Sequence, residues 1–189
     1  DQIVWALYQC LVDKGHEKVT IKEIAKKADL PPGVIHYYFK SKDEIISTLA
    51  TTLIEKYTHE IETVIQEAET PEQKIEASIA FIVDRLIFNL PVNRVFYNLI
   101  QMVFERNELS ITVRMMFENY RKQLSRIFRS AGAGHESELL GASLVAVTEG
   151  FSLQYMVDPD ALNRRDVLSV LSKMIQDRLD INITTAISG

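Results

Sequence analysis

Apolar residues recur every three or four positions along most of the chain, which is the spacing of an amphipathic α-helix. No stretch alternates apolar and polar residues in the way that predicts a β-strand, and no internal repeat or low-complexity linker interrupts the pattern. The five prolines and seven glycines lie mostly between the periodic stretches, where helices are expected to end. The sequence therefore predicts an all-α fold.

Nine helices follow from this periodicity. We expect them at about residues 2–14, 21–28, 32–39, 42–65, 71–89, 92–105, 110–130, 136–157 and 164–179. Capping boxes open two of them, at Thr20 and Ser41, because a hydroxyl and a Glu three residues later can satisfy the free amides of a helix start. Thr70 followed by Pro71 opens another. Gly15 is expected to end the first helix in the left-handed C′ conformation, and Pro91 to break the fifth.

The second and third predicted helices are short and are joined by a sharp turn at Asp29. Two such helices within a three-helix unit of about 45 residues, with basic residues nearby, are typical of a helix-turn-helix DNA reader. Between Lys18 and Lys42 there are six basic residues against two acidic ones, although the whole chain carries a net charge of −5. This contrast indicates one basic part that meets phosphate and a remainder that does not.

The residues of this unit resemble a known family. The stretch 3–15, the run Thr20-Ile21-Lys22-Glu23-Ile24-Ala25 and the run from Gly33 to Ile45 are similar to the N-terminal domain of TetR-type repressors. The resemblance implies a nine-helix, Ω-shaped TetR-type homodimer, with a DNA-binding domain over residues 1–46 and a ligand-binding and dimerisation domain over residues 47–189. The sequence begins at Asp1 without the basic arm that often precedes the first helix in this family.

Carried over position by position, the resemblance implies eight DNA-contacting residues. They are Thr20, Pro32, Gly33, Val34, His36, Tyr37, Tyr38 and Lys42. Val34 can meet a thymine methyl and Tyr37 can offer a hydroxyl to a base edge, whereas Lys42 suits a phosphate. Simpler roles stay open, since Thr20 can act as a helix cap alone and Tyr38 as packing. The family more often has Gly where Asp29 stands, a Ser or Thr cap where Pro31 stands, and Tyr at position 36.

The stretch from Leu139 to Gln154 is apolar on almost every side, so it must be covered from two directions. Residues 139–162 are similar to the C-terminal part of BetI-like members of the family. The family's architecture implies that the last two helices form a four-helix bundle with a second subunit. The expected interface residues are Leu144, Val147, Phe151, Leu168, Leu171, Met174 and Ile175.

A ligand pocket is expected among the fifth to eighth helices. Candidate lining residues are Phe81, Arg85, Phe88, Tyr97, Met102, Phe104, Phe117, Tyr120 and Glu149. Most of the aromatic ones could equally be core. Arg85 and Glu149 are more informative, because a charge in an apolar helix normally needs a partner. Three possibilities remain for them: they pair with each other, bind a ligand or face solvent. The ligand itself is expected to be an apolar or amphipathic small molecule.

These observations predict a ligand-responsive repressor that binds a palindromic operator in double-stranded DNA as a homodimer and is released by a small-molecule inducer. An activator is an open alternative, and so is a helical adaptor that only dimerises. The four histidines are scattered and no phosphate loop or nucleophile motif is found, so we expect no catalytic residues, metal or cofactor. The single cysteine and the lack of any signal segment or long apolar run favour a cytoplasmic protein without membrane contact.

Overall fold

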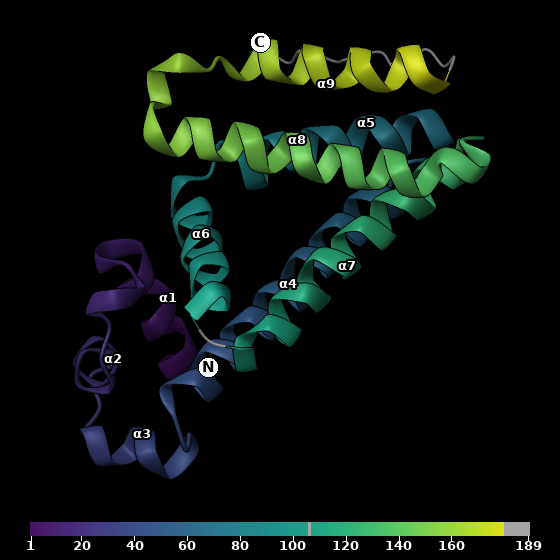
Figure 1. Ribbon diagram of the computed structural model, residues 1–189. Helices are drawn as coiled ribbons and strands as arrows, with labels where there is room; N and C mark the ends of the chain where they lie inside the picture. The colour runs from purple at the N-terminus through teal and green to yellow at the C-terminus, as the bar shows by residue number, and fades with distance from the viewer. Residues whose placement is uncertain (106, 180–189) are drawn as a thin grey trace. The chain divides into compact units, whose positions relative to one another are not determined.

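The computed structural model describes residues 1–105 and 107–179, with the side chains of residues 103–105, 107 and 108 outside the description. The described residues form nine α-helices and no strand, so the all-α prediction is confirmed (Figure 1). The helices are α1 Gln2–Lys14, α2 Ile21–Lys27, α3 Pro32–Tyr38, α4 Lys42–Gln66, α5 Pro71–Phe81, α6 Leu90–Glu105, α7 Asn107–Ser130, α8 Ser137–Val157 and α9 Arg164–Leu179. Short 3₁₀ turns add η1 His16–Lys18, η3 Gly134–Glu136 and η4 Pro159–Ala161.

The fifth predicted helix differs from expectation. It was predicted to run to Asn89, but α5 ends at Phe81 and the chain continues as a π-helical segment, η2, from Ile82 to Ile87. Ile82, Val83 and Ile87 remain buried in η2, so the apolar pattern gives no sign of the change in helix type. Helix α7 also begins three residues before the predicted Ser110.

Gly15 is a second correction. Its φ of 76° is positive as expected, but its ψ of 165° lies outside the left-handed helical region. The chain enters η1 directly after Gly15, and the His16 amide donates a hydrogen bond to Oδ1 of Asn98 at 2.7 Å. The extended ψ directs the chain toward this contact.

The chain forms two compact units. The first contains residues 1–56 and 94–117, and the second contains residues 57–93 and 118–179, counted over the described residues. In the first unit, α1 packs on α2 and α2 packs on α3. Its core is made of large aliphatic side chains that are at most 1% exposed: Leu7, Leu11, Ile24, Ile35, Ile45, Leu49 and Leu53. Burial of each such side chain stabilises the fold by roughly 1.5–3 kcal/mol.

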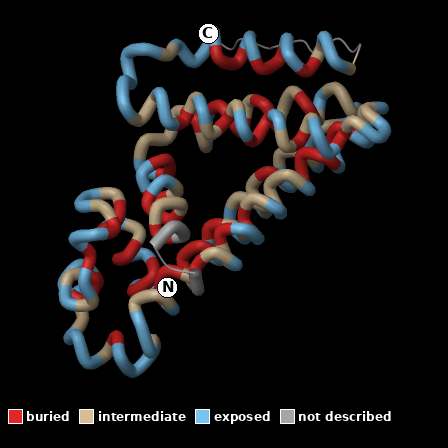
Figure 2. The backbone as a smooth tube through the Cα atoms, viewed as in Figure 1, coloured by how far each residue is buried: buried red, intermediate tan, exposed pale blue. Residues whose placement is uncertain are grey.

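In the second unit, η2 packs against α5 and α8, and α9 packs against α5 and η2. The buried residues of α9 line one side of that helix and the exposed residues the other, which is an amphipathic pattern (Figure 2). Asn119 of α7 also donates to the Thr58 hydroxyl of α4 at 2.8 Å. Within the described residues, no helix has both the length and the apolar character needed to cross a bilayer.

Candidate functional site

Helices α2 and α3 are set by local capping and by the turn between them. The Thr20 hydroxyl accepts a hydrogen bond from the Glu23 amide at 3.2 Å, so one half of the predicted capping box is present. The other half is not, because the Glu23 carboxylate pairs with Lys14 of α1. Asp29 takes a φ of 53°, a conformation that Asp tolerates better than most residues. Pro32 then occupies the first turn of α3, where its missing amide hydrogen costs nothing. The result is a seven-residue helix after a sharp turn, as the sequence predicted.

Helix α3 has one fully buried side chain, and most of its other residues are exposed. Ile35 is fully buried beneath it, whereas Tyr37 is 83% exposed and Tyr38 is 64% exposed. The two tyrosine rings lie edge to face, with centroids 5.1 Å apart. Six of the eight predicted DNA-contacting residues are exposed: Thr20, Pro32, Gly33, His36, Tyr37 and Tyr38. Val34 and Lys42 are partly buried. Large exposed aromatic side chains on a short helix can meet a partner at little cost in packing.

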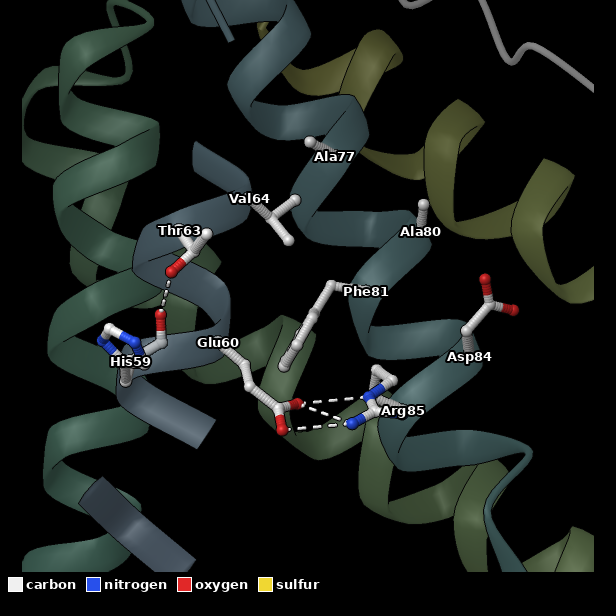
Figure 3. A pocket seen from close by; sticks show the side chains of 9 residues that line it. All are labelled: His59, Glu60, Thr63, Val64, Ala77, Ala80, Phe81, Asp84 and Arg85. Carbon is white, nitrogen blue, oxygen red and sulfur yellow. Dashed lines mark hydrogen bonds and ion pairs between the residues drawn. The ribbon is translucent and has the colours of Figure 1, made fainter. Parts of the chain in front are cut away.

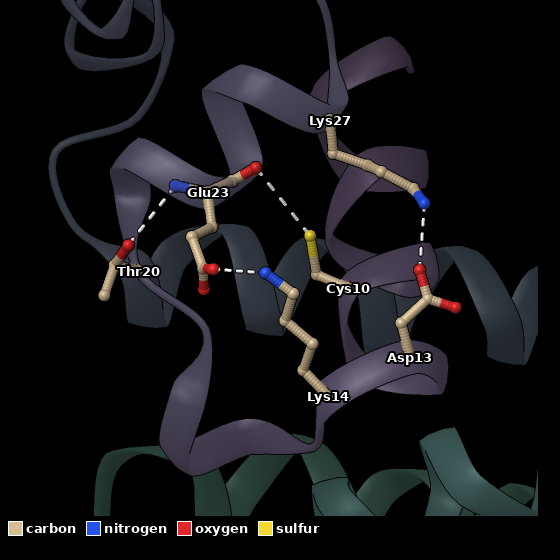
Figure 4. Close-up of polar contacts among 6 residues, drawn as sticks. All are labelled: Cys10, Asp13, Lys14, Thr20, Glu23 and Lys27. Carbon is tan, nitrogen blue, oxygen red and sulfur yellow. Dashed lines mark hydrogen bonds and ion pairs between the residues drawn. The ribbon is translucent and has the colours of Figure 1, made fainter.

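Polar contacts between α1 and α2 fix the support for α3 (Figure 4). Lys27 bonds Asp13 at 2.9 Å, and Lys14 pairs with the Glu23 carboxylate. The hydrogen bond from Lys14 lowers the pKa of Glu23 and raises that of Lys14. Cys10 donates weakly to the Glu23 carbonyl at 3.9 Å, and burial raises the pKa of its thiol. These contacts keep α1 and α2 together as one support.

Lys42 has a structural role that sequence reasoning missed. Its Nζ donates to the carbonyl of Val19 at 2.6 Å and to that of His16 at 3.2 Å. The segment before α2 is thereby tied to the start of α4. The cap of α4 also differs in detail from the prediction, because the Ser41 hydroxyl accepts from the Glu44 amide but the Glu44 carboxylate accepts from the Lys40 amide.

Asn98 on α6 is a further residue that the sequence did not single out. Its Oδ1 accepts from the His16 amide at 2.7 Å and lies 3.1 Å from the His16 ring. Arg94, one turn earlier, donates to the Val12 carbonyl at 3.3 Å. Asn98 is 82 positions from its partner, so no local pattern could have revealed this brace within the first unit.

The second unit contains a hollow of about 630 Å³ (Figure 3). Its lining comes from α4, α5 and η2: His59, Glu60, Thr63, Val64, Ala77, Ala80, Phe81, Asp84 and Arg85. Of the predicted ligand residues, Phe81 and Arg85 are here. The Arg85 guanidinium binds both carboxylate oxygens of Glu60, with Nε and Nη2 at 2.9–3.1 Å. Arg85 therefore has a partner that was not among the predicted possibilities.

The other predicted ligand residues are not in this hollow. Tyr97, Met102 and Phe117 belong to the first unit, and the Phe104 side chain lies outside the described residues. Phe88 packs against Tyr155 with a centroid distance of 4.8 Å. Of the predicted set, only Phe81 and Arg85 line this hollow.

Tyr120 and Glu149 are partly buried polar residues of the second unit. The Tyr120 hydroxyl is shielded from solvent. Burial, with the nearby Glu149 charge, raises the pKa of Tyr120 above its usual range. Burial also raises the pKa of Glu149 to about 7. Within the described chain, burial is the one cause of this shift, and no cation, Arg85 included, counteracts it by lowering the pKa of Glu149.

The predicted interface residues fall into two groups. Leu144, Leu168, Leu171 and Ile175 are at most 7% exposed within the single chain, so they have almost no area left to bury elsewhere. Met174 is 46% exposed, and Val147 and Phe151 are partly buried. Apolar side chains that the sequence did not single out are exposed on α8: Leu139, Leu153 and Val157.

Comparisons with known proteins bear on both units. Residues 3–49 match the model for bacterial regulatory proteins of the tetR family. Residues 71–180, more than half of the chain, match the C-terminal model of BetI-type transcriptional repressors. The chain is 29% identical over 79 residues to the transcriptional regulator BetI of Brucella canis, a match that spans 42% of this chain and 40% of that protein.

Longer matches are weaker in identity. The nicotine-responsive transcriptional repressor HdnoR of Paenarthrobacter nicotinovorans is 24% identical over 192 residues, with 95% of each chain covered. Among solved structures, the transcriptional regulator FadR of Bacillus subtilis in complex with stearoyl-CoA superposes with a TM-score of 0.76 at 20% identity and 97% coverage of each chain. This likeness concerns the fold.

Proposed function

The chain belongs to the TetR family of bacterial transcriptional regulators, and from that premise we propose that it is a repressor that binds a palindromic operator as a homodimer and is released by a small-molecule inducer. It is a regulator and not an enzyme. The proposal divides the chain into a DNA-binding domain over residues 1–46 and a ligand-binding and dimerisation domain over residues 47–189. Because it must reach the DNA that it regulates, the protein is expected to act in the cytoplasm.

One observation supports the proposed DNA-binding role most directly. Ile35 is the one fully buried residue of helix α3, which presents two adjacent tyrosine side chains, Tyr37 and Tyr38, that are more than 60% exposed. A major groove about 12 Å wide admits such a helix. We propose that Pro32, Gly33, Val34 and Tyr37 read base edges, and that Thr20, Tyr38 and Lys42 hold phosphates, with His36 beside them. The basic segment around them favours phosphate.

We propose that the second subunit covers one face of α8. Leu139, Ala146, Gly150, Leu153 and Val157 are all exposed and recur at helical spacing, so they form a single apolar stripe. Of the residues predicted earlier, Val147, Phe151 and Met174 retain area for this contact. An exposed apolar stripe of this kind is what a subunit interface would bury.

The inducer is proposed to be an apolar or amphipathic small molecule. HdnoR is nicotine-responsive and FadR was solved in complex with stearoyl-CoA, so two relatives of this chain are linked to small organic molecules, one of which has a long apolar chain. Two recognition helices must lie about one DNA turn apart, roughly 34–36 Å, to enter successive grooves. An inducer that favours a different spacing weakens operator binding, and the operator weakens inducer binding by the same factor.

The proposal is tested by selecting binding sites from a random DNA library. The expected result is a palindrome of about 15–25 base pairs whose affinity falls steeply with salt. Tyr37→Ala should weaken binding about tenfold or more without lowering thermal stability, since its side chain is exposed. Ile111→Ala, which removes an exposed apolar side chain from α7, is the matched control and should bind as wild type. Enrichment of no site would contradict the proposal.

A further inference from the structure

The hollow on α4, α5 and η2 combines an apolar floor with a charged rim. Val64, Ala77, Ala80 and Phe81 form the floor, and Phe81 is only 7% exposed. Figure 3 shows the Phe81 ring directed toward the ion pair of Glu60 and Arg85. A volume of about 630 Å³ lies within the range of small-molecule sites in proteins. The hollow can thus take an apolar body of moderate size.

The acidic groups of the rim are already engaged. Both oxygens of Glu60 accept hydrogen bonds from Arg85, and both oxygens of Asp84 accept from Arg164 of α9. An incoming cation would have to displace a guanidinium from a two-point contact. It would also meet the positive charge of that guanidinium at close range, so the rim disfavours a cationic ligand.

One hydrogen-bond donor at the rim is unused within the described residues. Arg85 uses Nε and Nη2 for Glu60, and its Nη1, which carries two N–H groups, makes no hydrogen bond within the described residues. Arginine can hold a second oxyanion at that edge while it keeps the first. The unfilled hydrogen-bonding capacity of the lining therefore includes a cationic donor, Nη1 of Arg85.

We propose that this hollow binds a small molecule with an apolar body and a carboxylate, the carboxylate on Nη1 of Arg85 and the body against Phe81, Val64, Ala77 and Ala80. The binding itself is independent of the DNA-reading role, and only the identification of the bound molecule as the inducer rests on the proposed function.

The Glu60–Arg85 ion pair also connects the hollow to helix α4. Arg85 joins η2 to Glu60, which lies on the same continuous helix that begins at Lys42 beside the proposed DNA-contacting residues. A ligand carboxylate on Arg85 stands near the Glu60 carboxylate and repels it. The Glu60–Arg85 pair is partly exposed and contributes little by itself, so this repulsion weakens the pair while Arg85 still contacts Glu60. Ligand binding at Arg85 thereby weakens the ion pair that joins η2 to α4.

The test uses three eight-carbon probes that differ in their head group: octanoate, octanol and octylammonium. Each is titrated into the full-length protein without DNA, below its critical micelle concentration, and binding is followed by calorimetry. Octanoate should bind saturably and about tenfold or more tightly than the other two, since only it gains the charge-assisted contact with Arg85.

Variants localise the contact. Arg85→Gln should weaken octanoate binding about tenfold and bring it level with octanol, and Ala80→Leu should weaken all three probes by filling the floor. Arg129→Gln is the matched control, because Arg129 forms an exposed ion pair with Glu138 of the same unit but does not line the hollow. Thermal melting of each variant checks that the fold is retained.

Three results would overturn the inference: no saturable binding of octanoate, equal binding of octanol or octylammonium, or unchanged octanoate binding by Arg85→Gln. If the protein selects an operator but does not bind octanoate in this titration, only the proposed ligand site is refuted. If it binds octanoate as expected but selects no operator, the proposed function is refuted and the ligand site is not. If bound octanoate leaves operator affinity unchanged, the coupling through Glu60 is refuted.

Discussion

The ammonium group of Lys42 donates to two backbone carbonyls, those of Val19 and His16, and it is also proposed to hold a phosphate. The sequence pointed to the phosphate because Lys42 matches a family position and opens a helix. It could not reveal the carbonyls, since these lie 23 and 26 positions away. At the scale of single residues, one cation therefore serves both the fold and the proposed interface.

We predict that Lys42→Ala lowers the free energy of unfolding by about 1–3 kcal/mol, because two partly buried carbonyls lose a charged donor. Urea denaturation measures the loss. Lys40→Ala, an exposed change two positions away, should stay within about 0.5 kcal/mol of wild type. If Lys42 also holds a phosphate, its variant lowers the salt slope of operator binding by about one. Equal stability of the two variants would rule out the structural role.

Glu149 predicts a pH dependence of stability. Burial raises its pKa from 4.5 in the unfolded chain to about 7, so the native state holds the proton more tightly. The stability that this group contributes is full below pH 4.5 and is lost as pH rises to about 7 and beyond, a loss on the order of 3 kcal/mol. Glu149→Gln should therefore be more stable than wild type at pH 8 and similar to it at pH 4.

Thermal melting from pH 4 to pH 8 measures this difference. Glu138→Gln is the control, since Glu138 lies on the same helix but has a largely exposed side chain, and its variant should follow the wild-type pH profile. A wild-type stability that rises between pH 5 and pH 7 relative to Glu149→Gln would show that Glu149 ionises readily in the folded protein.

At the scale of helices, three helix starts were predictable from local signals. Thr20, Thr70 and Pro32 act through residues three positions away or through their own ring, and the structure has each at a helix start. The π-helical segment η2 was not predictable, because its apolar residues face inward just as an α-helix would have them. The same holds for the candidate sites. The exposed face of α3 could be predicted from the local sequence pattern, whereas the pairing of Arg85 with Glu60, 25 positions away, could not.

Two glycines of α8 form a matched pair at this scale. A Cβ at Gly141 would lie 2.6 Å from Oγ of Ser125 and 3.0 Å from the Arg121 carbonyl on α7, whereas a Cβ at Gly150 would meet nothing within 4 Å. Gly141→Ala should thus destabilise the protein by about 1–3 kcal/mol. In the single chain nothing opposes a methyl group at Gly150, so Gly150→Ala should be neutral or stabilise by up to about 1 kcal/mol unless the proposed partner subunit packs tightly there.

Chemical denaturation of both variants decides the point. If Gly141→Ala is as stable as wild type, α7 and α8 do not approach as closely as the structure has them. If only Gly150→Ala is destabilised, the side of α8 that is open in the single chain is closely covered by another surface.

At the scale of the whole molecule, the proposed dimer depends on the exposed stripe of α8. Leu153→Glu places a charge in the middle of that stripe and should shift the protein toward monomer by about a hundredfold or more in dissociation constant. Sedimentation equilibrium measures the shift. Ile111→Glu, which changes an exposed apolar residue of the other unit, should leave the dimer intact. A dimer unaffected by Leu153→Glu would move the interface elsewhere.

The central claim is that two copies of this chain read one operator with paired α3 helices. Hydroxyl-radical footprinting of the selected site, combined with native mass spectrometry of the complex, tests it directly. The account predicts an even number of chains on each site and two protected major-groove segments with centres about one helical turn apart, or a whole multiple of it. A single chain on the DNA, or a single protected segment, would contradict it.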